Sequence, residues 1–136
     1  DSCNVARGSN MGNIENGQFI LPREVIKAAC NHFADMPKAT IKASTFCCGG
    51  GGGLLTDDLI ELRIKGAMPR MQALKQSQEN DGVNTLAAIC AICKSQFSKV
   101  LPNYDFDPYM IVSVHQLVSD ALVLSDKSKT KVEDSL

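Results

Sequence analysis

Residues 45–53 read TFCCGGGGG, two adjacent cysteines followed by five glycines. A disulfide between the neighbours Cys47 and Cys48 would be strained, because bridging requires converging Cβ vectors and successive side chains of extended chain diverge. Two adjacent thiols suit a metal cluster, which accepts thiolates from several directions. Glycines suit a backbone that passes close to a bulky group or adopts positive φ. The stretch therefore predicts a loop that wraps around a metal cluster.

Three further cysteines complete a C…CCG…CxxC pattern of five thiols, namely Cys3, Cys90 and Cys93. A CxxC pair places two sulfurs on one ion at a tight turn, as in zinc and iron–sulfur sites. A zinc ion or a cubane [4Fe–4S] cluster needs only four thiolates, so the five thiols exceed either need. A cluster with an unusual iron count or geometry would use all of them.

The negative charge of such a cluster needs hydrogen-bond donors nearby. The backbone N–H groups of Gly49, Gly50 and Gly51 can supply them as an anion-binding concavity. Arg7 follows Cys3 by four residues and could add a positive charge. An ordinary surface role suits Arg7 equally well, so both interpretations stay open.

The sixth cysteine and the histidines have simpler interpretations. Cys30 shares the apolar face of a predicted helix with Ile26 and Phe33, so we expect it in the core rather than on a metal. His32 and His115 could be ligands or acids, but a capping or core role suits them better. Thiol chemistry of the thioredoxin type would explain CxxC and leave the adjacent pair unexplained. A structural zinc domain is a further alternative.

Composition limits the class of protein. The chain has 136 residues, 44% hydrophobic and 21% charged, which is typical of one soluble globular domain. Its net charge of −1 gives no case for nucleic acid as a partner. No apolar run approaches the roughly 18–20 residues that span a bilayer, so we expect no direct membrane insertion. CxxC, the adjacent pair and the lack of a leader favour a reducing compartment, and the start at Asp1 indicates a fragment of a longer polypeptide or a processed chain.

Predicted strands and helices alternate along the chain. We expect strands over 40–46, 85–89 and 109–114, and helices over 22–33, 56–74, 94–101 and 115–124. A kink or break is expected between Gly66 and Pro69, a polar linker over 76–84 and a loop over 4–20. Leu117, Val118, Ala121 and Leu122 should face inward on the last helix.

Such alternation predicts an α/β fold, a small, mainly parallel sheet flanked by helices. Ligands of such sheets bind beyond the carboxyl ends of the strands, where Cys47 and Cys90 would both lie. We therefore expect the cysteines to converge at one edge of the sheet. The cluster-binding domain would span residues 1–124, followed by a charged, serine-rich, flexible tail over 125–136.

From Cys3 to about Leu124 the chain resembles the cysteine-rich CCG domain of heterodisulfide-reductase-type proteins. The segments that carry the resemblance are DSCNVAR at 1–7, FCCGGG at 46–51 and CAIC at 90–93. Within that family it looks most like the C-terminal part of the K subunit of the membrane complex associated with dissimilatory sulfite reductase. That likeness rests on residues 22–31, 59–70 and 113–117.

The resemblance implies a site, a cofactor and partners. It implies a noncubane [4Fe–4S] cluster held by Cys3, Cys47, Cys48, Cys90 and Cys93. For the K subunit it implies turnover of a disulfide or trisulfide on a small cysteine-bearing sulfur-carrier protein, in dissimilatory sulfur metabolism. It also implies a cytoplasmic oxidoreductase held at the membrane by other subunits of a redox complex.

The resemblance leaves two questions open. Glycolate- and glycerol-3-phosphate-oxidising iron–sulfur subunits share the domain and only pass electrons through it, so a non-catalytic electron-transfer module is an alternative. The intervals from Cys3 to Cys47 and from Cys48 to Cys90 are longer than usual for CCG domains. We assign the extra residues to loop insertions at about 8–20 and 76–84, with Cys30 as the substitute for the first ligand.

Overall fold

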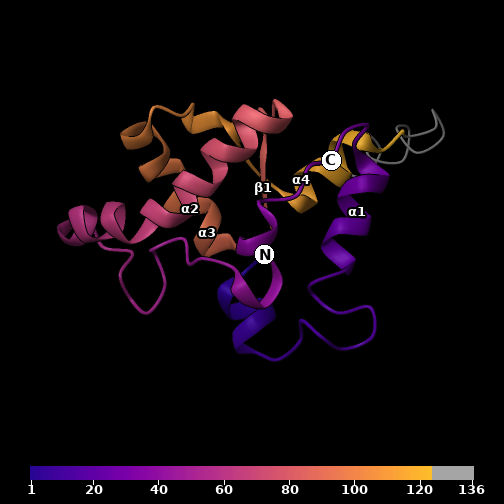
Figure 1. Cartoon of the computed structure of the whole chain (residues 1–136), viewed down its shortest axis with the longest axis horizontal. Coiled ribbons are helices and arrows are strands. Elements are labelled where there is room, and N and C mark those ends of the chain that lie inside the picture. The colour runs from indigo at the N-terminus through magenta and orange to yellow at the C-terminus, as the bar shows by residue number, and fades with distance from the viewer. Residues whose placement is uncertain (124–136) are drawn as a thin grey trace, which may run out of the picture.

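Two short strands pair in parallel at the centre of the chain's fold. They are β1, Leu86–Ala88, and β2, Ile111–Ser113, in a register that places Leu86 opposite Ile111 and Ala88 opposite Ser113. The crossover between them is the helix α3, Ala91–Val100, followed by 3₁₀ turns at Leu101–Tyr104 and Pro108–Met110. This computed structural model describes residues 1–123 (Figure 1). A small parallel sheet flanked by helices confirms the predicted α/β class.

The hydrophobic core lies between α3, the strands and the long helix α2, Ile60–Asp81. Its buried side chains come from these elements and from the turns between them, and they include Ala67, Met71, Leu74, Ala88, Phe97, Val100, Leu101, Phe106, Met110 and Ile111. Cys48 belongs to the same cluster of buried residues. The core therefore holds Cys48 against α2 and α3, whereas its neighbour Cys47 is exposed.

α2 corrects two predictions, because it runs without interruption through Pro69 and on to Asp81. Of the expected kink or break, the break was wrong: Ala67, Arg70 and Met71 are buried on both sides of Pro69, and this packing offsets the hydrogen bond that proline removes. The expected linker and loop insertion at 76–84 were wrong over most of their length, because glutamine and glutamate are good helix formers. The helix ends at Gly82, whose φ of +66° makes it a left-handed C-cap.

The predicted strand at 40–46 was also wrong. The structure has two 3₁₀ turns there, Lys38–Thr40 and Lys42–Ser44. Side chains bind the backbone groups that a ladder would need: the Lys42 N–H donates to the Asp1 carboxylate at 2.6 Å, and Arg7 donates to the carbonyls of Ala43 and Thr45. Cys47 consequently follows a turn and not a strand, whereas Cys90 does follow β1.

The N-terminal segment is more ordered than the predicted loop. Cys3–Gly8 forms a short π-helix, and the Ser2 hydroxyl caps it by accepting from the N–H of Val5 at 3.1 Å. Turns follow up to residue 20, and Phe19 is buried among them. Cys3 therefore lies on a capped helical turn.

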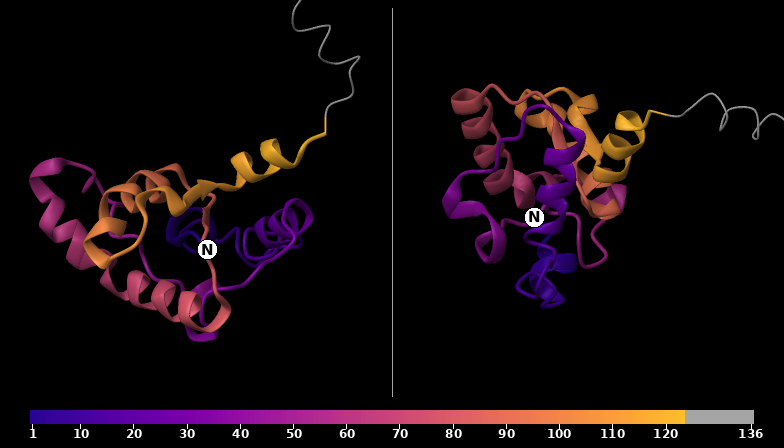
Figure 2. Two further views of the ribbon diagram at one scale, coloured as in Figure 1. Left: turned by 90° about the horizontal axis from the view of Figure 1, so that it is seen from above. Right: turned by 90° about the vertical axis from the view of Figure 1, so that its right-hand side faces the viewer.

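Two helices lie away from the core. α1, Leu21–Ala29, has no buried residue and contacts α4, Val114–Ala121, on the side of the molecule away from α2 (Figure 1 and Figure 2). α1 ends earlier than predicted, and Cys30 is its extended C-cap. α4 starts with a Ser113 cap, and its last turn is exposed, so the inward prediction was wrong for Ala121 and Leu122.

None of the described helices is both long enough and apolar enough to cross a lipid bilayer. The predicted tail over 125–136, together with Leu124, lies outside the described residues.

Candidate metal centre

Five thiols from three separate segments contact one another. The sulfurs of Cys3 and Cys47 lie 3.8 Å apart, although 44 positions separate the residues. The Cys48 thiol hydrogen-bonds with those of Cys47 and Cys93, and Cys93 in turn with Cys90. The contacts therefore run in one chain from the π-helix, through the glycine loop, to the first turn of α3.

Hydrogen bonds among the thiols give them different pKa values. The pKa of Cys48 falls to about 6, chiefly because its sulfur accepts a hydrogen bond from Cys93, with further help from the Gly50 N–H. The same bond to Cys48 raises the pKa of Cys93, and burial adds to the rise. Burial, and then the charge on Cys47, raise the pKa of Cys3. In the metal-free chain Cys48 is thus the thiolate and Cys93 its proton donor.

Two of the three predicted glycines donate N–H groups to sulfur. The Gly49 N–H donates to the Cys47 sulfur at 3.3 Å, and the Gly50 N–H donates to Cys48. Gly49 has a φ of +83°, a conformation that glycine adopts without strain. Gly51 faces open space. The donors thus come from the first two glycines, directly after the paired cysteines.

Arg7 links the segment that carries Cys3 to the segment that precedes Cys47. Its guanidinium donates to the carbonyls of Ala43, at 3.2 Å, and Thr45, at 2.7 Å, two to four residues before Cys47. Its positive charge also acts to lower the pKa of Cys3, against the larger effect of burial. Arg7 is exposed, as an ordinary surface arginine would be, and its role beside a metal cluster stays a prediction.

The sequence analysis missed a second arginine at this site. Arg70, on α2, is only 4% exposed, and its Nη2 donates to the Thr45 hydroxyl and, at 2.7 Å, to the Phe46 carbonyl. The sequence does contain a pattern that indicates this buried arginine. Arg63 and Arg70 are seven residues apart, on the helix face that also carries the buried Ala67 and Leu74. Two arginines inside an apolar stripe predict buried cations.

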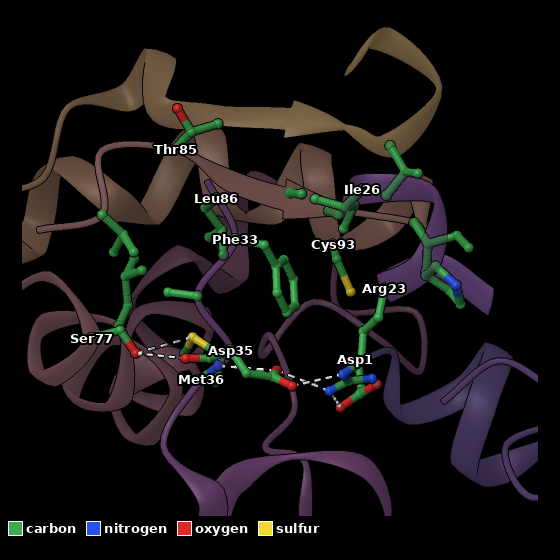
Figure 3. A pocket seen from close by; sticks show the side chains of 18 of the residues that line it. Asp1, Arg23, Ile26, Phe33, Asp35, Met36, Ser77, Thr85, Leu86 and Cys93 are labelled. Carbon is green, nitrogen blue, oxygen red and sulfur yellow. Dashed lines mark hydrogen bonds and ion pairs between the residues drawn. The ribbon is translucent and has the colours of Figure 1, made fainter. Parts of the chain in front are cut away.

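A cavity of about 770 Å³ lies between these thiols and α1. Cys3, Cys48, Cys90, Cys93 and Arg70 line it, and its opposite side includes Ile26, Phe33 and Leu117. Figure 3 shows the sulfur of Cys93 pointing into the pocket beside Phe33 and Arg23. This volume is within the range of small-molecule sites in proteins.

Cys30 and His32 line the cavity as well, at its α1 end. Cys30 is half-buried, belongs to no part of the core cluster, and makes no thiol contact within the described residues. Its predicted place in the core was therefore wrong. His32 is exposed at the edge of the cavity, and His115 is exposed on α4, so neither is a core histidine.

The arrangement suits a cluster of several metal atoms better than a single ion. Among residues 1–123, no three cysteine, histidine or carboxylate side chains converge closely enough to hold one metal ion. A tetrahedral zinc site needs four ligands about 2.0–2.3 Å from one centre. A cluster binds its thiolates through different iron atoms, so it accepts sulfurs that meet in pairs along a wall. The five thiols, the two N–H donors and the buried arginine fit such a group.

Comparison with known proteins gives two relatives. Over 125 residues, 92% of the chain, it is 45% identical to the Hdr-like menaquinol oxidoreductase iron–sulfur subunit 2 of Archaeoglobus fulgidus. It is 44% identical over the same length to the Hdr-like menaquinol oxidoreductase iron–sulfur subunit of Archaeoglobus profundus. The chain spans about a fifth of these relatives, 21% of each. No protein-family model and no solved structure matches it. These identities relate the chain to the Hdr-like iron–sulfur subunits, of which it matches one segment.

Proposed function

We propose that the chain is the cluster-binding domain of an Hdr-like oxidoreductase subunit. The observation that carries the proposal is the contact of five thiols from three segments, of which Cys3, Cys48, Cys90 and Cys93 also line a large cavity. The expected group is a noncubane [4Fe–4S] cluster held by Cys3, Cys47, Cys48, Cys90 and Cys93. When bound, such a cluster transfers electrons and offers iron to a substrate sulfur.

The residues around the thiols have distinct tasks in this proposal. Cys48 is 3% exposed and anchors the centre to the core, whereas Cys47 is exposed. The N–H groups of Gly49 and Gly50 hold negative charge on sulfur, as they already do in the metal-free chain. α1 and the residues after it close the far side of the cavity and limit the access of water.

The substrate proposed for this site is a disulfide or trisulfide of a small cysteine-bearing sulfur-carrier protein. Reductive cleavage of one S–S bond consumes two electrons and two protons; it leaves two thiols from a disulfide, or one thiol and one persulfide from a trisulfide, and oxidation is the reverse reaction. The relatives are named as menaquinol oxidoreductase subunits, and a quinol is a two-electron donor. The cavity beside Cys90 and Cys93 provides space for the sulfur atoms of such a substrate.

The proposed setting is a membrane-associated redox complex on the cytoplasmic side. The names of the relatives describe subunits of a quinol oxidoreductase, and quinols dissolve in the bilayer. Other subunits would hold this chain at the membrane, as the resemblance to the K subunit of the sulfite-reductase-associated complex implies. No nucleic acid has a part in it, because the net charge is only −1.

A non-catalytic electron-transfer module is the second candidate, and the names of the relatives, as iron–sulfur subunits, favour it as much as catalysis. Iron and sulfide analysis after anaerobic reconstitution tests the shared premise: about four of each per chain are expected for one [4Fe–4S] cluster. Zinc without sulfide would refute the premise.

Stopped-flow mixing of the reduced protein with a trisulfide-bearing carrier separates the two candidates. We expect cluster oxidation that saturates with carrier concentration and releases a persulfide or thiol. A cluster that passes electrons to a dye, and leaves the trisulfide intact, would identify the electron-transfer module.

A further inference from the structure

Arg70 differs from the half-buried Arg23 and the buried Arg63 in what surrounds it. Arg23 makes ion pairs with the carboxylates of Asp1 and Asp35, at 2.5 and 2.7 Å. Arg63 bonds to Gln96 and lies 3.7 Å from the Asp57 carboxylate. No carboxylate lies within 4.0 Å of the Arg70 guanidinium in the described part of the chain. Among the described residues, Arg70 is thus a buried cation without a carboxylate partner.

The hydrogen bonds of Arg70 leave its charge unbalanced. Its partners are the Thr45 hydroxyl and the Phe46 carbonyl, both of them neutral. An arginine stays protonated in proteins, and a buried charge is expensive unless an opposite charge accompanies it. Burial lowers the pKa of Arg70, and the thiols of Cys93, Cys48, Cys3 and Cys47 oppose that effect in this order. The groups that can balance this cation are therefore the thiolates.

The position of Arg70 also suits a cation that balances the charge of the thiolates. Its two acceptors immediately precede Cys47, and the residue lines the same cavity as Cys3, Cys48, Cys90 and Cys93. α2 is continuous through residue 70 and carries the neighbouring core residue Met71, so the guanidinium is held on a rigid element. A rigid buried cation beside thiolates stabilises whichever state of the centre carries more negative charge.

We propose that Arg70 is the fixed counter-charge of the metal centre, a positioning residue that favours its more reduced state. The inference rests on the proposed cluster. Adding an electron makes the centre more negative, so removing the positive charge should shift its midpoint potential to a more negative value. The hydrogen bonds to Thr45 and Phe46 give Arg70 a second, structural role, and the test must separate the two.

The test uses the full chain, reconstituted anaerobically, with Arg70→Gln, Arg70→Lys and the control Arg63→Lys. Redox titration followed by visible absorption gives the midpoint potential, and iron per chain gives the occupancy. Arg70→Gln should give a more negative potential, or lose the cluster altogether. Arg70→Lys keeps the charge and should keep the potential near that of the parent. Arg63→Lys should lower the melting temperature and leave the potential unchanged.

Three results would overturn the inference. An unchanged potential in a fully loaded Arg70→Gln protein would show that the charge has no effect on the centre. Equal shifts in Arg70→Gln and Arg70→Lys would assign the effect to the hydrogen bonds and not to the charge. A parent chain that takes up no iron would remove the proposed function together with this inference, whereas the first two results leave the cluster itself in place.

Discussion

The backbone of Gly49 lies directly against the backbone of Gly66, where the loop after the paired cysteines crosses α2. A β-carbon on Gly49 would lie 2.7 Å from the carbonyl oxygen of Arg63 and 3.0 Å from the carbonyl carbon of Gly66. A β-carbon on Gly66 would lie 3.4 Å from the Gly49 α-carbon. Two glycines at this crossing bring Cys48 into the core and set the loop on the helix that carries Arg70.

Gly49→Ala should therefore destabilise the protein. The substitution places a β-carbon against fixed helix backbone and forces alanine into positive φ, so we expect a loss of about 2 kcal/mol or more in the free energy of unfolding. Urea denaturation of the metal-free chain measures it. Gly51→Ala is the matched control, since a β-carbon there meets nothing within 4 Å. Equal stability of the two variants would contradict the close crossing.

The sequence predicted the parts of the fold that depend on continuous apolar runs. Residues 85–89 and 109–114 contain β1 and β2, because short apolar stretches bounded by polar residues are typical of buried strands. The segment over 40–46, predicted as a strand from its β-branched residues, forms turns instead, because Asp1 and Arg7 bind its backbone. Those contacts join residues about 40 positions apart, and no local pattern reveals them.

The candidate site was predictable in its thiols and not in its cation. Cys–Cys and CxxC are local motifs, and the structure brings all five cysteines together. The glycine donors also follow from their place beside Cys48. Arg70 lies 20 positions from the nearest of these cysteines, Cys90, inside a helix that was expected to kink or break next to it. Only the unbroken helix places its side chain at the site.

Cys47→Ala and Cys30→Ala should differ in iron content. Cys47 contacts the Cys3 sulfur, so its loss removes a proposed ligand, and iron per chain should fall sharply. Cys30 lines the cavity without contacting the other thiols, so its loss should leave iron unchanged and cost about 1 kcal/mol or less in stability. Iron and sulfide assays on chains reconstituted in parallel measure the difference. Equal iron loss would move Cys30 into the ligand set.

Gln96→Ala should destabilise the chain. Gln96 is fully buried, accepts from the Arg63 Nε at 2.8 Å and donates to the Arg63 carbonyl at 3.2 Å. Its removal leaves a cavity and a buried guanidinium with one partner fewer, so we expect a loss of about 2–4 kcal/mol. Thermal unfolding of the metal-free chain measures it. The exposed Gln116→Ala is the control and should change stability by less than about 0.5 kcal/mol.

Cys48 should make the stability of the reduced, metal-free chain depend on pH. Its pKa is about 6 in the folded chain and 9.0 ordinarily. Between these values the unfolded chain binds one proton more than the folded chain, so stability should rise with pH, by at most about 1.4 kcal/mol per unit. Above pH 9 the raised pKa of Cys93 reverses the sign, because the folded chain keeps a proton that the unfolded chain loses. Maximum stability is therefore expected near pH 9.

Urea denaturation at pH 6, 7, 8 and 9, with a reductant and a chelator, measures this dependence. Cys48→Ala removes the thiolate and leaves the titrating groups elsewhere in the chain, so the difference between parent and variant isolates the thiol. The difference should grow from pH 6 to pH 9. A constant difference would show that the Cys93 hydrogen bond does not hold Cys48 as a thiolate, because a thiol that keeps its proton in both the folded and the unfolded chain makes no pH-dependent contribution in this range.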